Sequence, residues 1–220
     1  MGFMNGTPGE VRPVRISPEG LEGLLGVPSS ANGLVIFAHG SGSGRLSPRN
    51  NRVAAALRDV GLATLLLDLL RPEEEMDRAN VFDIQLLASR LVSATNWASA
   101  NPDLSALRVG YFGASTGAGA ALVAAVHAQH DIAAVVSRGG RPDLAGEALE
   151  RVRAPTLLIV GGADGIVIDL NRFAYERLQH VKELVIIPGA GHLFEEPGTL
   201  DQVMDDAKRW FLRFLPRTRS

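Results

Sequence analysis

The 220-residue chain is 46% hydrophobic and 21% charged, with a formal net charge of −2 and no cysteine. This composition is ordinary for one globular domain, which we place over residues 1–220, and it excludes a disordered or fibrous chain. The missing cysteines exclude disulfides, thiolate metal sites and a cysteine nucleophile, and the balanced, scattered charge argues against nucleic-acid binding.

Metal and membrane binding also lack a signal in the sequence. The five histidines form no H-E-x-x-H pattern, and His127 and His130 fall at the polar end of a predicted helix, where solvent exposure is expected. Residues 1–12 contain no basic patch followed by an apolar core, and no run of 18 apolar residues occurs. We therefore expect a cytoplasmic protein with no metal site and no membrane contact.

The predicted strands begin with an antiparallel hairpin over residues 11–27, where short apolar pieces alternate with turn residues. Six continuous apolar runs follow. Runs of this kind are typical of parallel strands that are covered on both faces. They occupy residues 34–38, 63–67, 109–112, 133–136, 156–160 and 184–187.

Helical patterns lie between these strands. They cover residues 51–59, residues 79–97 with one apolar face, the segment after Ser115, and a C-terminal stripe from Leu200 to Phe214. The alternation predicts an α/β fold: a mostly parallel central sheet with helices on both faces and right-handed crossovers. About twenty residues between the strands at 133–136 and 156–160 leave no room for a large lid domain, so we expect an open site.

The sequence Gly113-Ala114-Ser115-Thr116-Gly117 lies between a predicted strand and a predicted helix. In that context G-x-S-x-G indicates a nucleophile elbow, a strained turn on which the serine hydroxyl is exposed. The flanking glycines let the turn form against adjacent strands and helices. Ser115 is therefore the predicted nucleophile.

An acid and a histidine follow later strands, in the order expected of α/β-hydrolases. Asp164 comes after the run at 156–160, and His192 comes after the run at 184–187. We expect His192 to act as the base and Asp164 to orient it. Asp68 and Asp169 are weaker candidates, because Asp68 precedes the serine and Asp169 is predicted to cap the helix that contains residues 172–178.

Two backbone N–H groups are predicted to form an oxyanion hole, those of Thr116 and Ser41. Thr116 opens the helix after the nucleophile, and Ser41 lies in the glycine-rich loop 39–44. That loop also resembles a phosphate cradle, but it matches neither the P-loop nor the G-x-G-x-x-G pattern. For His39, a hydrogen bond to the loop backbone is a better interpretation than a second base.

Arg138 and Arg141 follow the run at 133–136 and fall at the carboxyl edge of the predicted sheet, where ligands of open α/β folds bind. Both are candidates to bind an anionic substrate. A surface ion pair with Asp143 or Glu147 is an equally good interpretation. Residues 69–78, which include three consecutive glutamates, predict a solvated rim of the site.

These motifs together resemble the α/β-hydrolase superfamily, and within it the small dienelactone-hydrolase-like branch, over residues 34–214. The resemblance implies hydrolysis of carboxylic esters, lactones or thioesters of small molecules on a Ser115–Asp164–His192 triad, without a cofactor. Dienelactone hydrolases carry cysteine at the elbow, so Ser115 favours a more general esterase. Acyl transfer, including perhydrolysis, and a non-catalytic binding module on the same fold remain alternatives, and the oligomeric state is left open.

Overall fold

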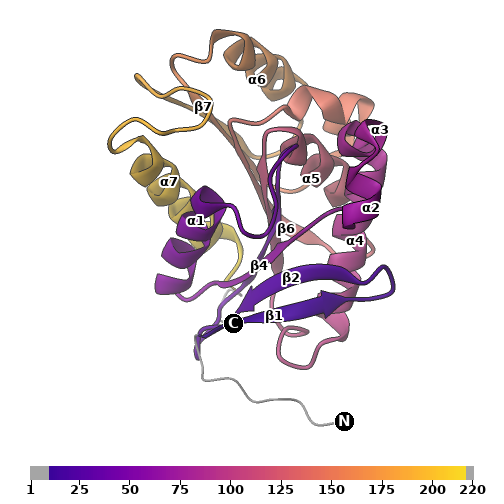
Figure 1. The fold of residues 1–220 in the computed structure, drawn as a ribbon. Helices are drawn as coiled ribbons and strands as arrows, with labels where there is room; N and C mark the ends of the chain where they lie inside the picture. Colours follow the sequence, from indigo (N-terminus) through magenta and orange to yellow (C-terminus); the bar gives the residue numbers. More distant parts are fainter. Residues whose placement is uncertain (1–9, 217–220) are drawn as a thin grey trace.

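A computed structural model describes residues 10–216, which share one eight-stranded sheet in the order β1-β2-β4-β3-β5-β6-β7-β8 (Figure 1). The hairpin β1–β2 forms as predicted, β2 is also antiparallel to β4, and strands β3 to β8 are parallel. The strands are β1 (Val11–Ile16), β2 (Leu21–Gly26), β3 (Leu34–Ala38), β4 (Ala63–Leu67), β5 (Val109–Ala114), β6 (Ile132–Arg138), β7 (Thr156–Gly161) and β8 (Lys182–Ile187).

Helices cover both faces of this sheet, which confirms the predicted α/β fold (Figure 1). One face packs against α1 (Pro48–Asp59) and α7 (Thr199–Phe214), whose apolar stripes join one core cluster. The other face packs against α4 (Ile84–Ala100), α5 (Thr116–His127) and α6 (Gly165–Arg177). Strands β3 to β7 are buried along their whole length, as the continuous apolar runs predicted.

Two helix predictions are wrong in position. The helix expected over residues 79–97 is split into α3 (Arg78–Phe82) and α4, because the Asp83 carboxylate accepts the Leu86 N–H at 3.0 Å and starts a new helix. Helix α6 begins at Gly165, so Asp169 lies inside it rather than at its cap. The Asp169 carboxylate instead lies 3.5 Å from the Arg172 guanidinium.

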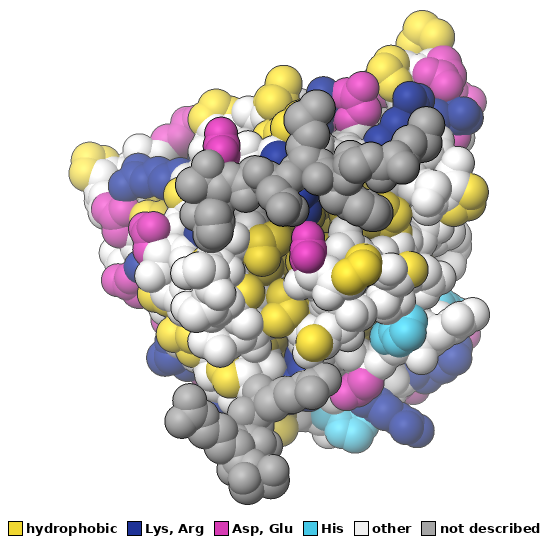
Figure 2. Space-filling view, turned by 90° about the horizontal axis from the view of Figure 1, so that it is seen from below, with side chains coloured by type: hydrophobic (Ala, Val, Ile, Leu, Met, Phe, Trp, Pro, Cys, Tyr) yellow, Lys and Arg dark blue, Asp and Glu magenta, His cyan; other side chains and the backbone are white. Residues whose placement is uncertain are grey.

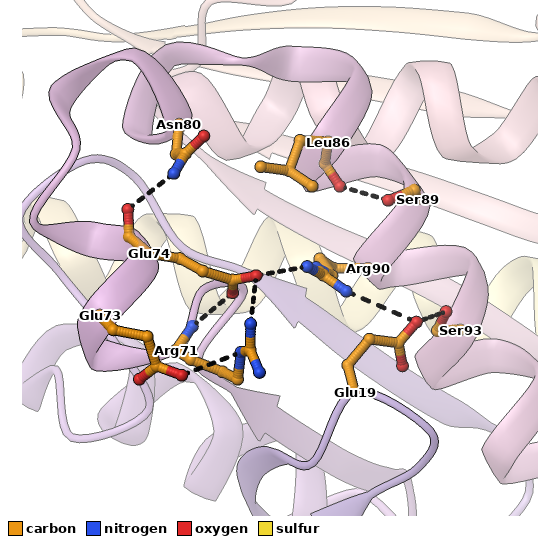
Figure 3. Close-up of polar contacts among 9 residues, drawn as sticks. All are labelled: Glu19, Arg71, Glu73, Glu74, Asn80, Leu86, Ser89, Arg90 and Ser93. Carbon is orange, nitrogen blue, oxygen red and sulfur yellow. Dashed lines mark hydrogen bonds and ion pairs between the residues drawn. The ribbon is translucent and has the colours of Figure 1, made fainter.

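The segment after β4 forms the short helices α2 (Pro72–Glu75) and α3, and an ion pair between Glu74 and Arg90 of α4 attaches it to the body of the protein (Figure 3). Glu74 Oε1 lies 3.0 Å from Arg71 Nη2 and 2.7 Å from Arg90 Nη2, and Arg90 also faces Glu19 of the hairpin turn. Burial acts to raise the pKa of Glu74, but hydrogen bonds from Arg71 and the charge of Arg90 outweigh it and lower that pKa. The predicted rim is thus a braced helical segment rather than an open loop.

Strands β6 and β7 are joined by a short connection that contains only the 3-10 helix η1 (Pro142–Arg151). No lid domain covers the carboxyl edge of the sheet within residues 10–216, as expected.

Figure 2 shows the molecule from below the view of Figure 1. On this face acidic, basic and hydrophobic side chains are interspersed. None of the helices in the described part of the chain has the length and apolar character needed to cross a membrane.

Candidate active site

Ser115 stands on a strained turn between β5 and α5. Its backbone has φ 50° and ψ −124°, a conformation that side-chain-bearing residues rarely adopt. Glycine is required on both sides, because a Cβ at Gly113 would lie 2.5 Å from Ala118 Cα and a Cβ at Gly117 would overlap the Ala38 carbonyl oxygen. The Ser115 side chain makes no capping hydrogen bond to α5, so its hydroxyl is not used in the turn.

Asp164 and His192 meet at the carboxyl edge, as predicted from their positions after β7 and β8. The His192 Nδ1–H donates to Asp164 Oδ2 at 2.7 Å. Asp164 occupies the N-cap position of α6 but makes no capping bond, because its carboxylate is turned to the histidine. The His192 side chain is 40% exposed and the Asp164 side chain is 18% exposed. The imidazole is therefore oriented by a mostly buried carboxylate and remains accessible from outside.

Phe194 and Glu196 hold the loop that carries His192. Phe194 adopts a positive φ of 55° and is buried. Hydrogen bonds from the Gly191 amide, together with the amides of Glu196 and Glu195, lower the pKa of the Glu196 carboxyl. Glu196 and Phe194 were not singled out from the sequence, although both lie within four residues of the predicted base. They fix the turn that presents the imidazole.

Ser115 and His192 line the same cavity of about 700 Å³. Its walls come from residues 39–49, which are the loop after β3 and the start of α1, from Asp68 and Leu70 after β4, from Glu75 of α2, and from Arg138 and Gly139 at the end of β6. No hydrogen bond joins Ser115 Oγ to His192 Nε2 among the described residues. Nucleophile–base contacts are often long in proteins without substrate and tighten when substrate binds.

The Gly40–Ser41 peptide, which carries one predicted oxyanion amide, is held at both ends. Its carbonyl accepts the His39 Nδ1–H at 2.9 Å and the Ser43 N–H at 3.2 Å. Its N–H donates to Thr116 Oγ1 at 3.2 Å. The Thr116 amide itself belongs to the first turn of α5, where helix geometry provides no intrahelical acceptor. The two predicted oxyanion residues are thus in direct contact, through the Thr116 hydroxyl.

His39 is a structural histidine, as expected. The Leu69 amide donates to its Nε2 at 3.0 Å, so the proton of the neutral ring lies on Nδ1, where it reaches the Gly40 carbonyl. Asp68 also serves the loop, since its carboxylate accepts the Arg45 amide at 2.7 Å and pairs with the Arg45 side chain. Neither His39 nor Asp68 is free to replace His192 or Asp164.

Arg138 is buried at the β6 end of the cavity. Arg138 is 7% exposed. This burial, with a smaller effect of the Arg49 charge, lowers the pKa of Arg138 to about 10. It therefore remains protonated at neutral pH. Its Nη2 donates to Asn50 Oδ1 at 3.4 Å, and its guanidinium lies 5.9 Å from the centre of the Phe194 ring. Asn50 was not predicted as a site residue. The sequence does carry a signal for it, because Asn50 is a polar residue at a position that continues the apolar face of α1.

Arg141 differs from Arg138. Its side chain is 38% exposed and makes two hydrogen bonds to Asp143, at 2.9 and 2.8 Å, the surface pair considered as the alternative. It does not line the cavity of Ser115. Its backbone N–H donates to the Ser115 carbonyl at 2.9 Å, which helps to hold the strained turn. The described residues contain no cluster of three or more His, Cys, Asp or Glu arranged to hold a metal ion.

Comparison with known proteins places this geometry in a family. The model of the dienelactone hydrolase family matches residues 21–215. The solved structure of a dienelactone hydrolase from Anabaena variabilis ATCC 29413 is 58% identical, with a TM-score of 0.90 over 94% of this chain and 98% of that one. An α/β serine hydrolase without lid from Xanthomonas campestris, 21% identical with a TM-score of 0.77 over 97% of this chain and 99% of that one, shares the fold.

Curated relatives come from Mycobacterium tuberculosis. A protein of strain H37Rv named "Putative phosphoribosyl transferase" is 59% identical over 198 residues, which are 90% of this chain and 45% of that protein. An uncharacterized protein of the same strain is 32% identical, over 84% of this chain and 71% of its own length. The chain thus spans about half the length of the first of these relatives.

Proposed function

The chain belongs to the dienelactone hydrolase family, and from this membership and the geometry of its cavity we propose that it is a serine hydrolase of carboxylic esters. Its substrate is a small-molecule ester, and lactones or thioesters are attacked by the same chemistry. Because the chain spans 45% of the M. tuberculosis relative named as a transferase, that name is not carried over to it.

In the proposed first half-reaction, His192 Nε2 takes the proton of Ser115 Oγ as that oxygen attacks the ester carbonyl carbon. Asp164 accepts the His192 Nδ1–H, so it fixes the tautomer and stabilises the imidazolium that forms. The Thr116 amide stabilises the negative charge on the carbonyl oxygen, and the Ser41 amide joins it by exchanging its bond to Thr116 Oγ1 for one to the oxyanion. His192 then protonates the leaving alcohol, the C–O bond breaks, and Ser115 carries the acyl group.

The second half-reaction repeats these steps with water as the nucleophile. His192 removes a proton from water, the water oxygen attacks the acyl carbon, and the proton returns to Ser115 Oγ as the acid leaves. No cofactor or metal takes part in either half. The 40% exposure of the His192 side chain supports this step, since water reaches the base without movement of a lid.

The strained backbone of Ser115 is the observation that best supports the proposal. A positive φ at a non-glycine residue costs about 1 to 3 kcal/mol and persists only where the surroundings enforce it. Here the enforcement comes from bonds that the Arg141 and Ala118 amides donate to the Ser115 carbonyl, at 2.9 and 3.1 Å. A serine held in this way, in one cavity with a carboxylate-bound histidine, is arranged as a nucleophile.

The direct test is turnover of 4-nitrophenyl acetate by the wild type and by Ser115→Ala. We expect kcat to fall by about 10⁴-fold or more in the variant, with an unchanged circular dichroism spectrum. Equal turnover by both proteins contradicts the proposal. Added methanol or hydrogen peroxide at fixed ester concentration distinguishes hydrolysis from acyl transfer, because a transferase diverts most of the acyl product to the added acceptor.

A further inference from the structure

Asn171 of α6 is a fully buried polar residue with no part in the chemistry described above. It lies between Val167 and Ala174 on the buried face of the helix and is 0% exposed. Its Nδ2 donates two hydrogen bonds, to the Gly140 carbonyl at 3.0 Å and to the Val167 carbonyl at 2.8 Å. The first bond leaves the helix and reaches residues 138–141 at the end of β6, which we call the β6 turn.

The β6 turn holds the backbone of the nucleophile on both sides. The Ser115 amide donates to the Arg138 carbonyl at 3.4 Å, and the Arg141 amide donates to the Ser115 carbonyl at 2.9 Å. These bonds fall on the residue whose φ of 50° is strained. A shift of the β6 turn therefore shifts Ser115.

The β6 turn also lies against the catalytic base. Gly139 lines the cavity and has a φ of 50°. A Cβ placed on Gly139 would lie 2.9 Å from the His192 carbonyl oxygen and 3.7 Å from His192 Nδ1, so the turn and the histidine loop approach each other closely. The same four residues thus contact both the nucleophile and the base.

Asn171 joins this turn to the acid of the triad. Asp164 is the N-cap residue of α6, and Asn171 lies about two turns further along the same helix. The bond to Gly140 links the helix that begins at the acid to the turn that contacts Ser115 and His192. We propose that Asn171 is a positioning residue that sets, through the β6 turn, the distance between Ser115 and the acid–base pair. This inference rests on the proposed function.

Filling space in the core does not require an amide at this position. The Asn171 Oδ1 is buried without a hydrogen-bond partner, which costs free energy. An apolar side chain of similar shape would fill the same volume without that cost. What the amide supplies, and an apolar side chain cannot, is a donor to the Gly140 carbonyl.

The β6 turn has little room to move without affecting the reaction. A Cβ on Gly140 would overlap the Ser137 hydroxyl, so the turn is tightly packed against the end of β6. Ser115 and His192 line one cavity but are not hydrogen-bonded to each other among the described residues, so they come together only when substrate binds. A misplacement of about 1 Å can cost about 100-fold in rate.

The test uses Asn171→Leu, which keeps the size of the side chain and removes its donors. On 4-nitrophenyl acetate kcat should fall by about 10- to 100-fold while KM changes less than about threefold, because the triad is intact but misplaced. Labelling of Ser115 by a fluorophosphonate should slow by the same factor. Ala174→Gly is the control: it weakens α6 and leaves the bond to Gly140 in place, so kcat should stay within about twofold of the wild type.

Asn171→Ser provides the same test if the leucine variant does not fold. The serine hydroxyl still donates to the Val167 carbonyl, as serines within helices do, but it is too short to reach Gly140. It should therefore lose kcat as Asn171→Leu does.

The inference is overturned if a folded Asn171 variant keeps kcat within about threefold of the wild type. It is also overturned if Ala174→Gly, with an equal loss of Tm, loses as much kcat as the Asn171 variants. A wild type without Ser115-dependent activity gives a different result, since it contradicts the proposed function itself.

Discussion

At the β3 end of the cavity each polar group of the oxyanion peptide has a partner, whereas at the β6 end the Arg138 guanidinium has one long hydrogen bond and a free Nε. Groups that act on a transition state are most effective when their neighbours already hold them in place. Groups that bind a ligand keep donors unused until the ligand arrives. On the proposed function, the first region carries the catalytic amides, whereas the second contributes a buried cation with an unused donor to the cavity lining.

We expect the largest loss of kcat from Asp164→Asn, a change in the catalytic region. The asparagine NH2 can donate to Nδ1 and so favour the other tautomer of His192, and the amide carries no charge to stabilise the imidazolium, so kcat should fall by about 10³- to 10⁴-fold. Steady-state kinetics on 4-nitrophenyl acetate measure this loss. A kcat close to that of the wild type would contradict the role of Asp164 and break the comparison.

Gly117→Ala tests the packing beneath the nucleophile. The added methyl group overlaps the Ala38 and His39 carbonyl oxygens, so we expect the free energy of unfolding to fall by about 1 to 3 kcal/mol. Urea denaturation measures this loss. Gly165→Ala is the control, because nothing lies within 4 Å of its added Cβ and its stability should be unchanged or slightly higher. Equal stability of both variants would show that the turn is not tightly packed.

Thr116→Val tests the clamp on the oxyanion peptide. The variant removes the oxygen that accepts the Ser41 amide, so the Gly40–Ser41 peptide is held only through its carbonyl and its orientation is less fixed. We therefore expect kcat to fall by about 10-fold with little change in KM. Thr116→Ser keeps the hydroxyl and should retain most of the activity. If Ser and Val have the same effect, the hydroxyl does not orient the amide.

Asn50→Ala should change the protein least among these variants. It removes the long hydrogen bond from Arg138, so we expect the free energy of unfolding, measured by urea denaturation, to fall by about 1 kcal/mol with little change in kcat. A kcat lowered by about 10-fold or more would show that Asn50 supports the catalytic region instead.

The fold was largely predictable because its signal is local. Continuous apolar runs marked the six parallel strands, and for β3 and β4 even their ends. The errors have local causes too. Apolar periodicity continues through Asp83, but that carboxylate caps a new helix, and Asp164 takes the cap position of α6 that had been predicted for Asp169.

The candidate site was predictable where residues follow a motif and not where their burial depends on distant neighbours. Asp164 and His192 meet as their positions after two strands indicated. Arg138 and Arg141 look alike in sequence, but Arg141 finds Asp143 two residues away, whereas Arg138 finds Asn50, 88 residues away. Which arginine enters the cavity is decided by tertiary packing.

Labelling with a fluorophosphonate probe, with intact mass as the readout, tests the central claim that Ser115 is an activated nucleophile. The account predicts one label on the wild type, none on Ser115→Ala, and much slower labelling of Asp164→Asn. Equal labelling of the wild type and Ser115→Ala, or no labelling of the folded wild type, would contradict it.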